Sequence, residues 1–189
     1  MSIDIKPDVV LDFWFAEGME EKWYFAGDEF DQIVQDKFLD IHTKAAKGEL
    51  DHWSKTREGR LALIIVLDQF SRNIYRGCSK AFDTDKTALE LARHALRMGD
   101  DIWFKKNKPD GWRSFIYVVF MHSENVEDQR RCLELFLTHG PENSIPFARD
   151  HLDVIYRFGR FPNRNKTLKR KSTPEEEEFL SVGGVGWGK

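Results

Sequence analysis

The sequence contains little cysteine and no long apolar run. Its 189 residues include two cysteines, Cys78 and Cys132, which form no CxxC pair, so we expect both to be reduced thiols. No uninterrupted apolar stretch approaches the length that a transmembrane helix needs. The N-terminal segment also lacks the basic start and apolar stretch of a signal peptide. These absences predict a cytoplasmic protein with no membrane partner.

The sequence also lacks a strong excess of charge of either sign. Its formal net charge is −3 and its pI is about 6.1, which argues against a general nucleic-acid binder but is compatible with a local basic patch. Charged residues make up 32% of the chain, and it contains 15 Phe and 6 Trp. This composition predicts a strongly polar surface around an aromatic interior.

The well-known catalytic and cofactor motifs are absent as well. The sequence has no HExxH, no GxSxG, no Walker loop and no GxGxxG that opens a helix. We therefore expect no cofactor. A metal site would require His122 and His151 to converge with an acid such as Glu124 or Asp153, and no local spacing indicates this arrangement.

Helical periodicity is the main structural signal that the chain does contain. Apolar residues recur at helical spacing in successive segments, and no segment alternates as a strand would. The expected helices cover residues 7–14, 28–48, 60–70, 83–99, 115–121, 123–140 and 141–158, with a turn at 109–111. Helices joined by short turns predict an all-α, antiparallel helical array. We expect a single helical domain over residues 1–182 and a flexible glycine-rich tail over residues 183–189.

A further helix is expected near the C-terminus. Thr173 precedes Pro174 and is followed three residues later by Glu176. Serine or threonine at the N-cap, proline at the first helical position and glutamate at the third form a capping box. The pattern predicts that a short helix begins directly after Thr173.

Four polar residues, Asp68, His122, Gln129 and His151, fall on helix faces that the apolar pattern predicts to be buried. Burying a polar group is costly unless it meets a partner. These residues therefore pair with one another in one network, or they line a site. Arg72 follows Asp68 by one helical turn and is expected to pair with it.

The segment 157–171 is strongly basic and contains no acidic residue. Its arginines include Arg157, Arg160 and Arg164, and arginine forks suit the oxygens of phosphate and carboxylate groups. The segment is compatible with a solvated loop balanced by the acidic run at 175–178, or with an anion site. A nucleic-acid surface is less favoured, because the aromatic residues are not regularly interleaved.

Several strings of residues resemble those of a known family. Residues 67–77 read LDQFSRNIYRG, residues 122–124 read HSE, residues 157–162 read RFGRFP, and residues 172–176 read STPEE. Together they resemble the DUF924 family of bacterial proteins of unknown function. The resemblance implies a fold similar to the right-handed helix-pair packing of tetratricopeptide-repeat proteins, without their repeat consensus. It implies no catalytic residue.

The chain departs from that family at two positions. The family often has histidine where this chain has Asn163, and Leu-Gly-Arg where residues 168–170 read LKR. If the family's histidine serves a shared activity, Asn163 places that activity in question for this chain.

Three hypotheses for function follow from these patterns. The leading one is a helical binding module whose positively charged cleft holds an anionic small molecule or an acidic peptide. The second is an enzyme that acts on a phosphorylated or carboxylated metabolite, with His122 or His151 as the general base. The third is a structural or interaction protein whose polar network is closed to solvent. The sequence leaves the oligomeric state open. The residues expected to line the cleft are Arg72, Asn73, His122, Glu124, His151, Arg157, Arg160 and Arg164.

Overall fold

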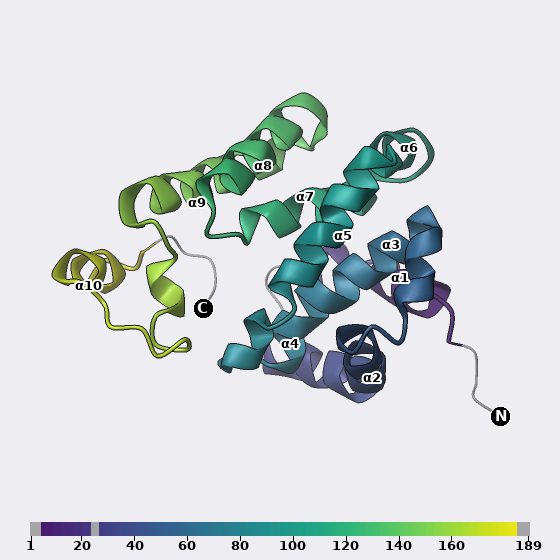
Figure 1. The fold of residues 1–189 in the computed structure, drawn as a ribbon, viewed down its shortest axis with the longest axis horizontal. Coiled ribbons are helices and arrows are strands. Elements are labelled where there is room, and N and C mark those ends of the chain that lie inside the picture. Colours follow the sequence, from purple (N-terminus) through teal and green to yellow (C-terminus); the bar gives the residue numbers. More distant parts are fainter. Residues whose placement is uncertain (1–4, 24–26, 185–189) are drawn as a thin grey trace.

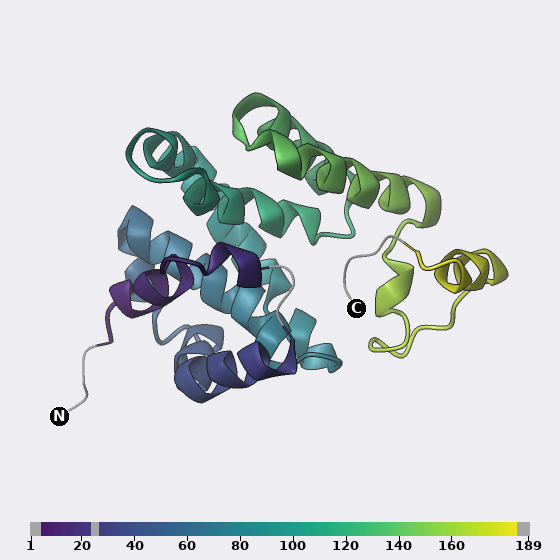
Figure 2. The same ribbon diagram turned by 180° about the vertical axis from the view of Figure 1, so that it is seen from behind.

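The computed structural model describes residues 5–23 and 27–184, and the described part of the chain is all-helical, with no strand. Figures 1 and 2 show α8 and α9 side by side, and α10 at the end of the molecule that lies away from α1. Within these ranges, no helix combines the length and the apolar character that crossing a membrane requires.

The first half of the chain is organised around one continuous buried helical segment. It begins with α3 (Arg57–Ile64), passes through the π-helical turn η3 (Ile65–Phe70) and ends with α4 (Ser71–Ile74). Each residue from 61 to 71 is buried. The predicted central helix is thus present, and the helices α1 (Asp8–Trp14) and α2 (Asp28–Ala46) pack against it.

The next three helices differ from the sequence prediction in two places. α5 (Asp85–Arg97) ends as expected, but Gly99, with a φ of 70°, leads directly into α6 (Asp100–Asn107), which periodicity did not reveal. The predicted turn at 109–111 is also wrong, because α7 (Asp110–Met121) already begins at its second residue. The apolar residues of α7 do not follow a one-sided helical spacing, because the helix is buried on almost every side.

The last helices are α8 (Val126–His139), α9 (Ile145–Phe158) and α10 (Pro174–Ser181). The side chain of Asn125 caps α8 by accepting a hydrogen bond from the Glu127 amide at 2.8 Å. Shorter helical turns lie in the connections: η1 (Glu20–Lys22), η2 (Asp51–Lys55), η4 (Ser79–Phe82), η5 (Glu142–Ser144) and η6 (Pro162–Arg164). Most of the predicted tail, residues 185–189, lies outside the described residues.

The buried apolar side chains form two clusters. The larger one contains residues from Val10 to Ala148. The smaller one consists of Val154, Ile155 and Phe161, against which Phe179 of α10 packs. The C-terminal segment therefore has its own small apolar contact surface, and this surface holds η6 beside the rest of the molecule.

The capping box predicted at the start of α10 is confirmed. The Thr173 hydroxyl accepts a hydrogen bond from the Glu176 amide at 3.2 Å, and the Glu176 carboxylate accepts one from the Thr173 amide at 2.8 Å. Replacing Thr173 with alanine is expected to lower the free energy of unfolding by about 1 kcal/mol, because it leaves amides of the first turn without a partner. Urea unfolding followed by circular dichroism measures this. The exposed Thr87→Ala serves as the matched control, and an equal effect of both variants would contradict the prediction.

Candidate functional site

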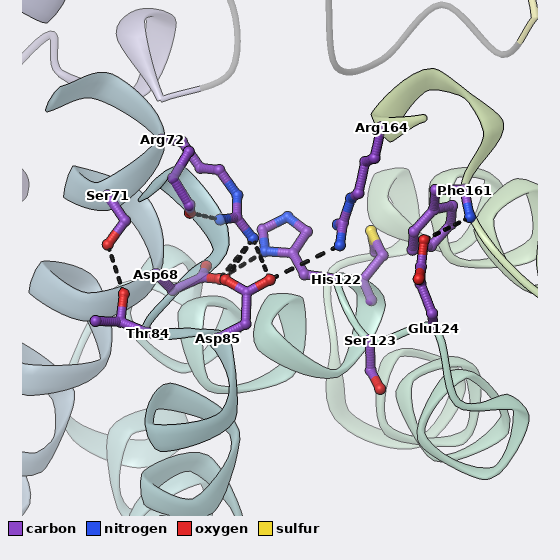
Figure 3. Close-up of polar contacts among 12 residues, drawn as sticks. Asp68, Ser71, Arg72, Thr84, Asp85, His122, Ser123, Glu124, Phe161 and Arg164 are labelled. Atoms are coloured by element: carbon purple, nitrogen blue, oxygen red, sulfur yellow. Dashed lines mark hydrogen bonds and ion pairs between the residues drawn. The ribbon is translucent and has the colours of Figure 1, made fainter. Parts of the chain in front are cut away.

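The polar residues with the most connected contacts gather around Asp68, which η3 places in the interior (Figure 3). Its carboxylate accepts a hydrogen bond from His122 Nδ1 at 2.7 Å, and another from the side-chain amide of Gln69. Burial raises the pKa of Asp68, but the interactions with His122, Arg72 and Gln69 lower it by more. Asp68 is therefore ionised at neutral pH, and π-helical turns of this kind occur frequently at functional sites.

Arg72 contacts two carboxylates. Its Nη2 lies 3.9 Å from Asp68 Oδ1, so the predicted Asp68–Arg72 ion pair is present, but the same nitrogen lies only 2.8 Å from Asp85 Oδ1. Its Nη1 donates a hydrogen bond to the Ala81 carbonyl oxygen, and its guanidinium carbon lies 4.6 Å from the centre of the Phe82 ring. Asp85, the first residue of α5, is thus the main partner of Arg72.

A second arginine approaches Asp85 from the C-terminal segment. Arg164 ends η6, and its Nη1 lies 3.7 Å from Asp85 Oδ2. Its guanidinium group lies between two rings, with 4.8 Å to the centre of Phe82 and 4.7 Å to that of Phe161. Although its side chain is only 13% exposed, no hydrogen bond joins it to a residue in the described ranges. The guanidinium fork is therefore mostly covered, and its contacts within the described residues are the ion pair with Asp85 and the two rings.

The electrostatics of this cluster follow from two cations that share one carboxylate. The pKa of Arg164 is lowered to about 10, mainly by burial and in addition by the nearby charge of Arg72. Burial also raises the pKa of Asp85, with Asp68 adding to this effect and both arginines opposing it. Two guanidinium groups and two carboxylates, those of Asp68 and Asp85, thus lie together here, and Arg164 is the arginine farther from Asp85.

Glu124 holds the segment that carries Arg164. Its carboxylate accepts hydrogen bonds from the Phe161 amide at 2.8 Å and from both terminal nitrogens of Arg170, at 2.7 and 2.9 Å. Burial raises the pKa of Glu124, and the hydrogen bonds from Arg170 and Phe161 lower it by more. Glu124 is therefore an ionised anchor of this segment. Lys169, which directly precedes Arg170, has a φ of 54°. This conformation favours glycine, the residue that the family resemblance implies at position 169.

His151 lies close to the cluster but in the interior. It is 6% exposed, its Nδ1 donates a hydrogen bond to the Phe147 carbonyl oxygen at 2.7 Å, and its ring contacts Phe161 with centroids 5.6 Å apart. Burial lowers the pKa of His151 to about 3, and the nearby charge of Arg164 contributes to the same shift, whereas the hydrogen bond to Phe147 opposes it. His151 is therefore neutral and packs behind the site.

Three of the predicted cleft residues make their contacts elsewhere. Arg157 pairs with Glu175 at 2.8 Å, and Arg160 forms two hydrogen bonds to Glu176, at 2.6 and 2.7 Å. Both arginines thus bind α10, because the acidic first turn of that helix offers ionised partners next to them. Asn73 donates a hydrogen bond to Asp31 on α2 at 2.8 Å. We therefore leave Arg157, Arg160 and Asn73 out of the candidate site.

Gln129 also belongs to a different set of contacts. Its side-chain amide donates hydrogen bonds to the carbonyl oxygens of Met121 and Ser123, at 2.7 and 2.6 Å. It therefore closes the end of α7, where backbone carbonyls lack helical partners. The expectation that the four buried polar residues form one network is correct for Asp68 and His122 but not for Gln129.

Sequence reasoning missed Asp85, Phe82 and Arg170 as members of this region. Asp85 follows Thr84 at a helix start, within the stretch 83–99 that was predicted only to be helical. In fact the Thr84 hydroxyl makes no cap hydrogen bond and donates instead to the Leu67 carbonyl oxygen at 2.6 Å. The sequence signal that could have indicated this region was the presence of Phe82 and Asp85 shortly after the segment from Asp68 to Arg72.

The cluster reaches the surface rather than enclosing a deep cavity. The side chains of His122, Arg72 and Arg164 are 21%, 20% and 13% exposed, respectively. A hollow of about 250 Å³ lies elsewhere, beside α6 and α8, where Asp101, Arg131 and His139 are among its lining residues. We assign the site to the cluster because its polar groups converge.

No group of three or more potential metal ligands occurs within residues 5–23 and 27–184.

The structure thus defines an all-helical protein with a semi-buried Asp–His–Arg cluster. A family model described as "Bacterial protein of unknown function (DUF924)" matches residues 10–184, so the chain belongs to the DUF924 family, as its motifs indicate. A solved protein of unknown function, ATU0120 from Agrobacterium tumefaciens, is 38% identical and has the same fold, with a TM-score of 0.86 over 94% of this chain and 97% of that one. No curated protein matches the sequence.

Proposed function

We propose that the cluster around Asp85 binds a small anionic ligand, whose phosphate or carboxylate oxygens accept hydrogen bonds from Arg164 and Arg72. The observation that carries this proposal is the guanidinium fork of Arg164, which is mostly buried, forms no hydrogen bond with a described residue and lies 3.7 Å from its nearest carboxylate oxygen. Placing a charged group in the interior without hydrogen bonds is costly, and a bound oxyanion removes that cost.

The position of the fork favours an anion. Asp85 is the carboxylate nearest to Arg164, at 3.7 Å, and Asp85 is already paired more closely with Arg72, at 2.8 Å. The rings of Phe82 and Phe161 limit the access of water to Arg164, and charge-assisted hydrogen bonds strengthen in such surroundings. A purely structural network would instead satisfy this arginine internally, which is why we favour binding.

Two broader features complete the proposal. Cys78 and Cys132 are both free, and Cys78 is exposed, which fits a cytoplasmic protein. The antiparallel contacts of α7 with α8 and of α8 with α9 fit the helix-pair packing of tetratricopeptide-repeat proteins. We propose that the protein is cytoplasmic and that its helices pack in this way. As the ligand we favour a small molecule over an acidic peptide, because the exposed fraction of the arginine side chains is small.

The proposal is tested by titrating the protein with inorganic phosphate in isothermal calorimetry and thermal unfolding. We expect phosphate to raise the Tm, and Arg164→Ala to weaken phosphate binding by about 10- to 100-fold, because a charged hydrogen-bonding partner contributes roughly 1.5–3 kcal/mol. Arg164→Lys should bind with intermediate affinity, since lysine keeps the charge but loses the fork. Added salt should weaken the effect.

The exposed Arg149→Ala is the matched control and should bind phosphate as the wild type does. Circular dichroism of each variant shows whether the fold is retained. The proposal is wrong if phosphate stabilises the wild type no more than sodium chloride of the same ionic strength. It is also wrong if Arg164→Ala and Arg149→Ala bind phosphate equally well.

A further inference from the structure

The two ring nitrogens of His122 differ in their hydrogen bonding. Its Nδ1 is hydrogen-bonded to Asp68 at 2.7 Å, whereas no residue in the described part of the chain forms a hydrogen bond with its Nε2. The side chain is 21% exposed, and Figure 3 shows its ring between Arg72 and Arg164. Both arginines lie within 4 Å of Asp85, at 2.8 and 3.7 Å.

The partner of Nδ1 determines which ring nitrogen carries the proton. A buried, ionised carboxylate only accepts hydrogen bonds, so Nδ1 of His122 must be the donor. In the neutral ring the lone pair is then on Nε2, on the side that faces the proposed anion site. A carboxylate that orients a histidine in this way also stabilises the imidazolium that forms when Nε2 takes up a proton.

The other buried histidines do not offer this arrangement. His42 Nε2 lies 2.7 Å from the Ser71 hydroxyl in the interior of the protein, and burial lowers the pKa of His42. His151 is buried behind Phe161, as described above. Of the two histidines that the sequence suggested as bases, the geometry therefore favours His122.

We propose that this site hydrolyses a small phosphate monoester, with His122 as the general base. The inference rests on the anion binding proposed above. A tetrahedral phosphoryl group presents several oxygens and can accept hydrogen bonds from both Arg72 and Arg164, whereas one arginine fork already satisfies a carboxylate. A phosphoryl group is therefore the anion that best matches two guanidinium groups around one position.

The proposed step transfers the phosphoryl group to water. Nε2 of His122 takes a proton from the water as its oxygen forms a bond to phosphorus, and the ester P–O bond breaks. The departing alkoxide oxygen leaves on the opposite side of phosphorus and takes a proton from solvent water, while Nε2 releases its proton to solvent, so that an alcohol and inorganic phosphate leave. Arg72 and Arg164 stabilise the charge on the phosphoryl oxygens in the transition state. Asp68 acts as a positioning residue, since it touches His122 and not the substrate.

The test is the release of p-nitrophenol from p-nitrophenyl phosphate. We expect the wild type to catalyse it, and His122→Gln to lower kcat by about 100- to 10,000-fold, the usual contribution of a general base. His122→Gln should still bind inorganic phosphate. Asp68→Asn should lower kcat with little change in KM, because it disturbs the orientation of His122, whereas Arg72 keeps its closer contact with Asp85 and Arg164 does not contact Asp68. The exposed His52→Gln is the matched control and should retain full activity.

The outcomes separate this inference from the binding proposal. If the wild type binds phosphate but does not hydrolyse p-nitrophenyl phosphate, the catalytic inference is overturned and phosphate binding stands. Hydrolysis that persists in His122→Gln also overturns it. If phosphate does not bind at all, the proposed anion site itself fails.

Discussion

Replacing Asp68 with alanine is expected to lower the free energy of unfolding by about 3–5 kcal/mol, because removing one partner of a buried ion pair leaves uncompensated charge and donors behind. Asp68 is fully buried and accepts hydrogen bonds from His122 and Gln69. Without it, the amide of Gln69 and the Nδ1 proton of His122 lose their acceptor. Arg72 keeps Asp85 as a partner, so the effect comes mainly from His122 and Gln69.

Guanidinium chloride unfolding at pH 7 measures this loss. Asp68→Asn provides a graded comparison and should be less destabilising, because its amide oxygen can still accept one hydrogen bond in a side chain of nearly the same shape. The exposed Asp150→Ala is the control and should change the free energy of unfolding by less than about 0.5 kcal/mol. An unfolding midpoint of Asp68→Ala equal to that of the wild type would show that the buried carboxylate is not required for stability.

The second large effect is a loss of stability in mild acid that originates at His151. Burial lowers the pKa of His151 to about 3, from the 6.5 of an unperturbed histidine. The unfolded chain therefore binds a proton below pH 6.5 that the folded protein does not bind. The stabilising contribution of neutral His151 is complete above pH 6.5 and is lost as the pH falls toward 3. Between pH 6.5 and 4.5 we expect a loss of about 2–3 kcal/mol.

This pH window separates His151 from the acids whose pKa values are lowered. Asp85, whose pKa burial raises, acts in the opposite direction, because the folded protein then binds its proton more readily than the unfolded chain does. The pKa values of Asp68, Glu124 and Glu176 are all lowered in the folded protein, so their contributions are lost only in more acidic solution. His42, whose pKa burial also lowers, adds to the effect in the same window as His151.

Urea unfolding at a series of pH values measures this slope. His151→Gln should reduce the loss of stability between pH 6.5 and 4.5, because glutamine does not titrate, whereas the exposed His52→Gln should leave the slope as in the wild type. A slope that is the same in all three proteins would show that His151 is not kept neutral by burial.

The sequence predicted most elements whose features are local. The capping box at Thr173, the end of α5 before Gly99 and the buried segment 60–70 depend on residues within a few positions of one another. Such features are determined by hydrogen bonds and apolar spacing within one or two helical turns. α6 was missed because its short sequence has no clear apolar face, although Phe104 within it is fully buried.

The candidate site was only partly predictable. The apolar pattern before Asp68 and before His122 showed that both side chains point inward, and the two do form a hydrogen bond. The same reasoning treated all arginines of the segment 157–171 alike, although Arg157 and Arg160 bind α10 and only Arg164 reaches Asp85. Charge and residue type do not distinguish between these arginines.

The sequence by itself therefore determined the helical class, the family and the inward direction of the polar residues, because periodicity and motifs are carried by neighbouring residues. Only the tertiary structure decided which of these residues meet. The shared contact of Arg72 and Arg164 with Asp85 joins segments that are far apart along the chain. Their approach depends on how the helices pack and on how Glu124 and Arg170 hold the C-terminal segment, and local sequence patterns do not encode such long-range distances.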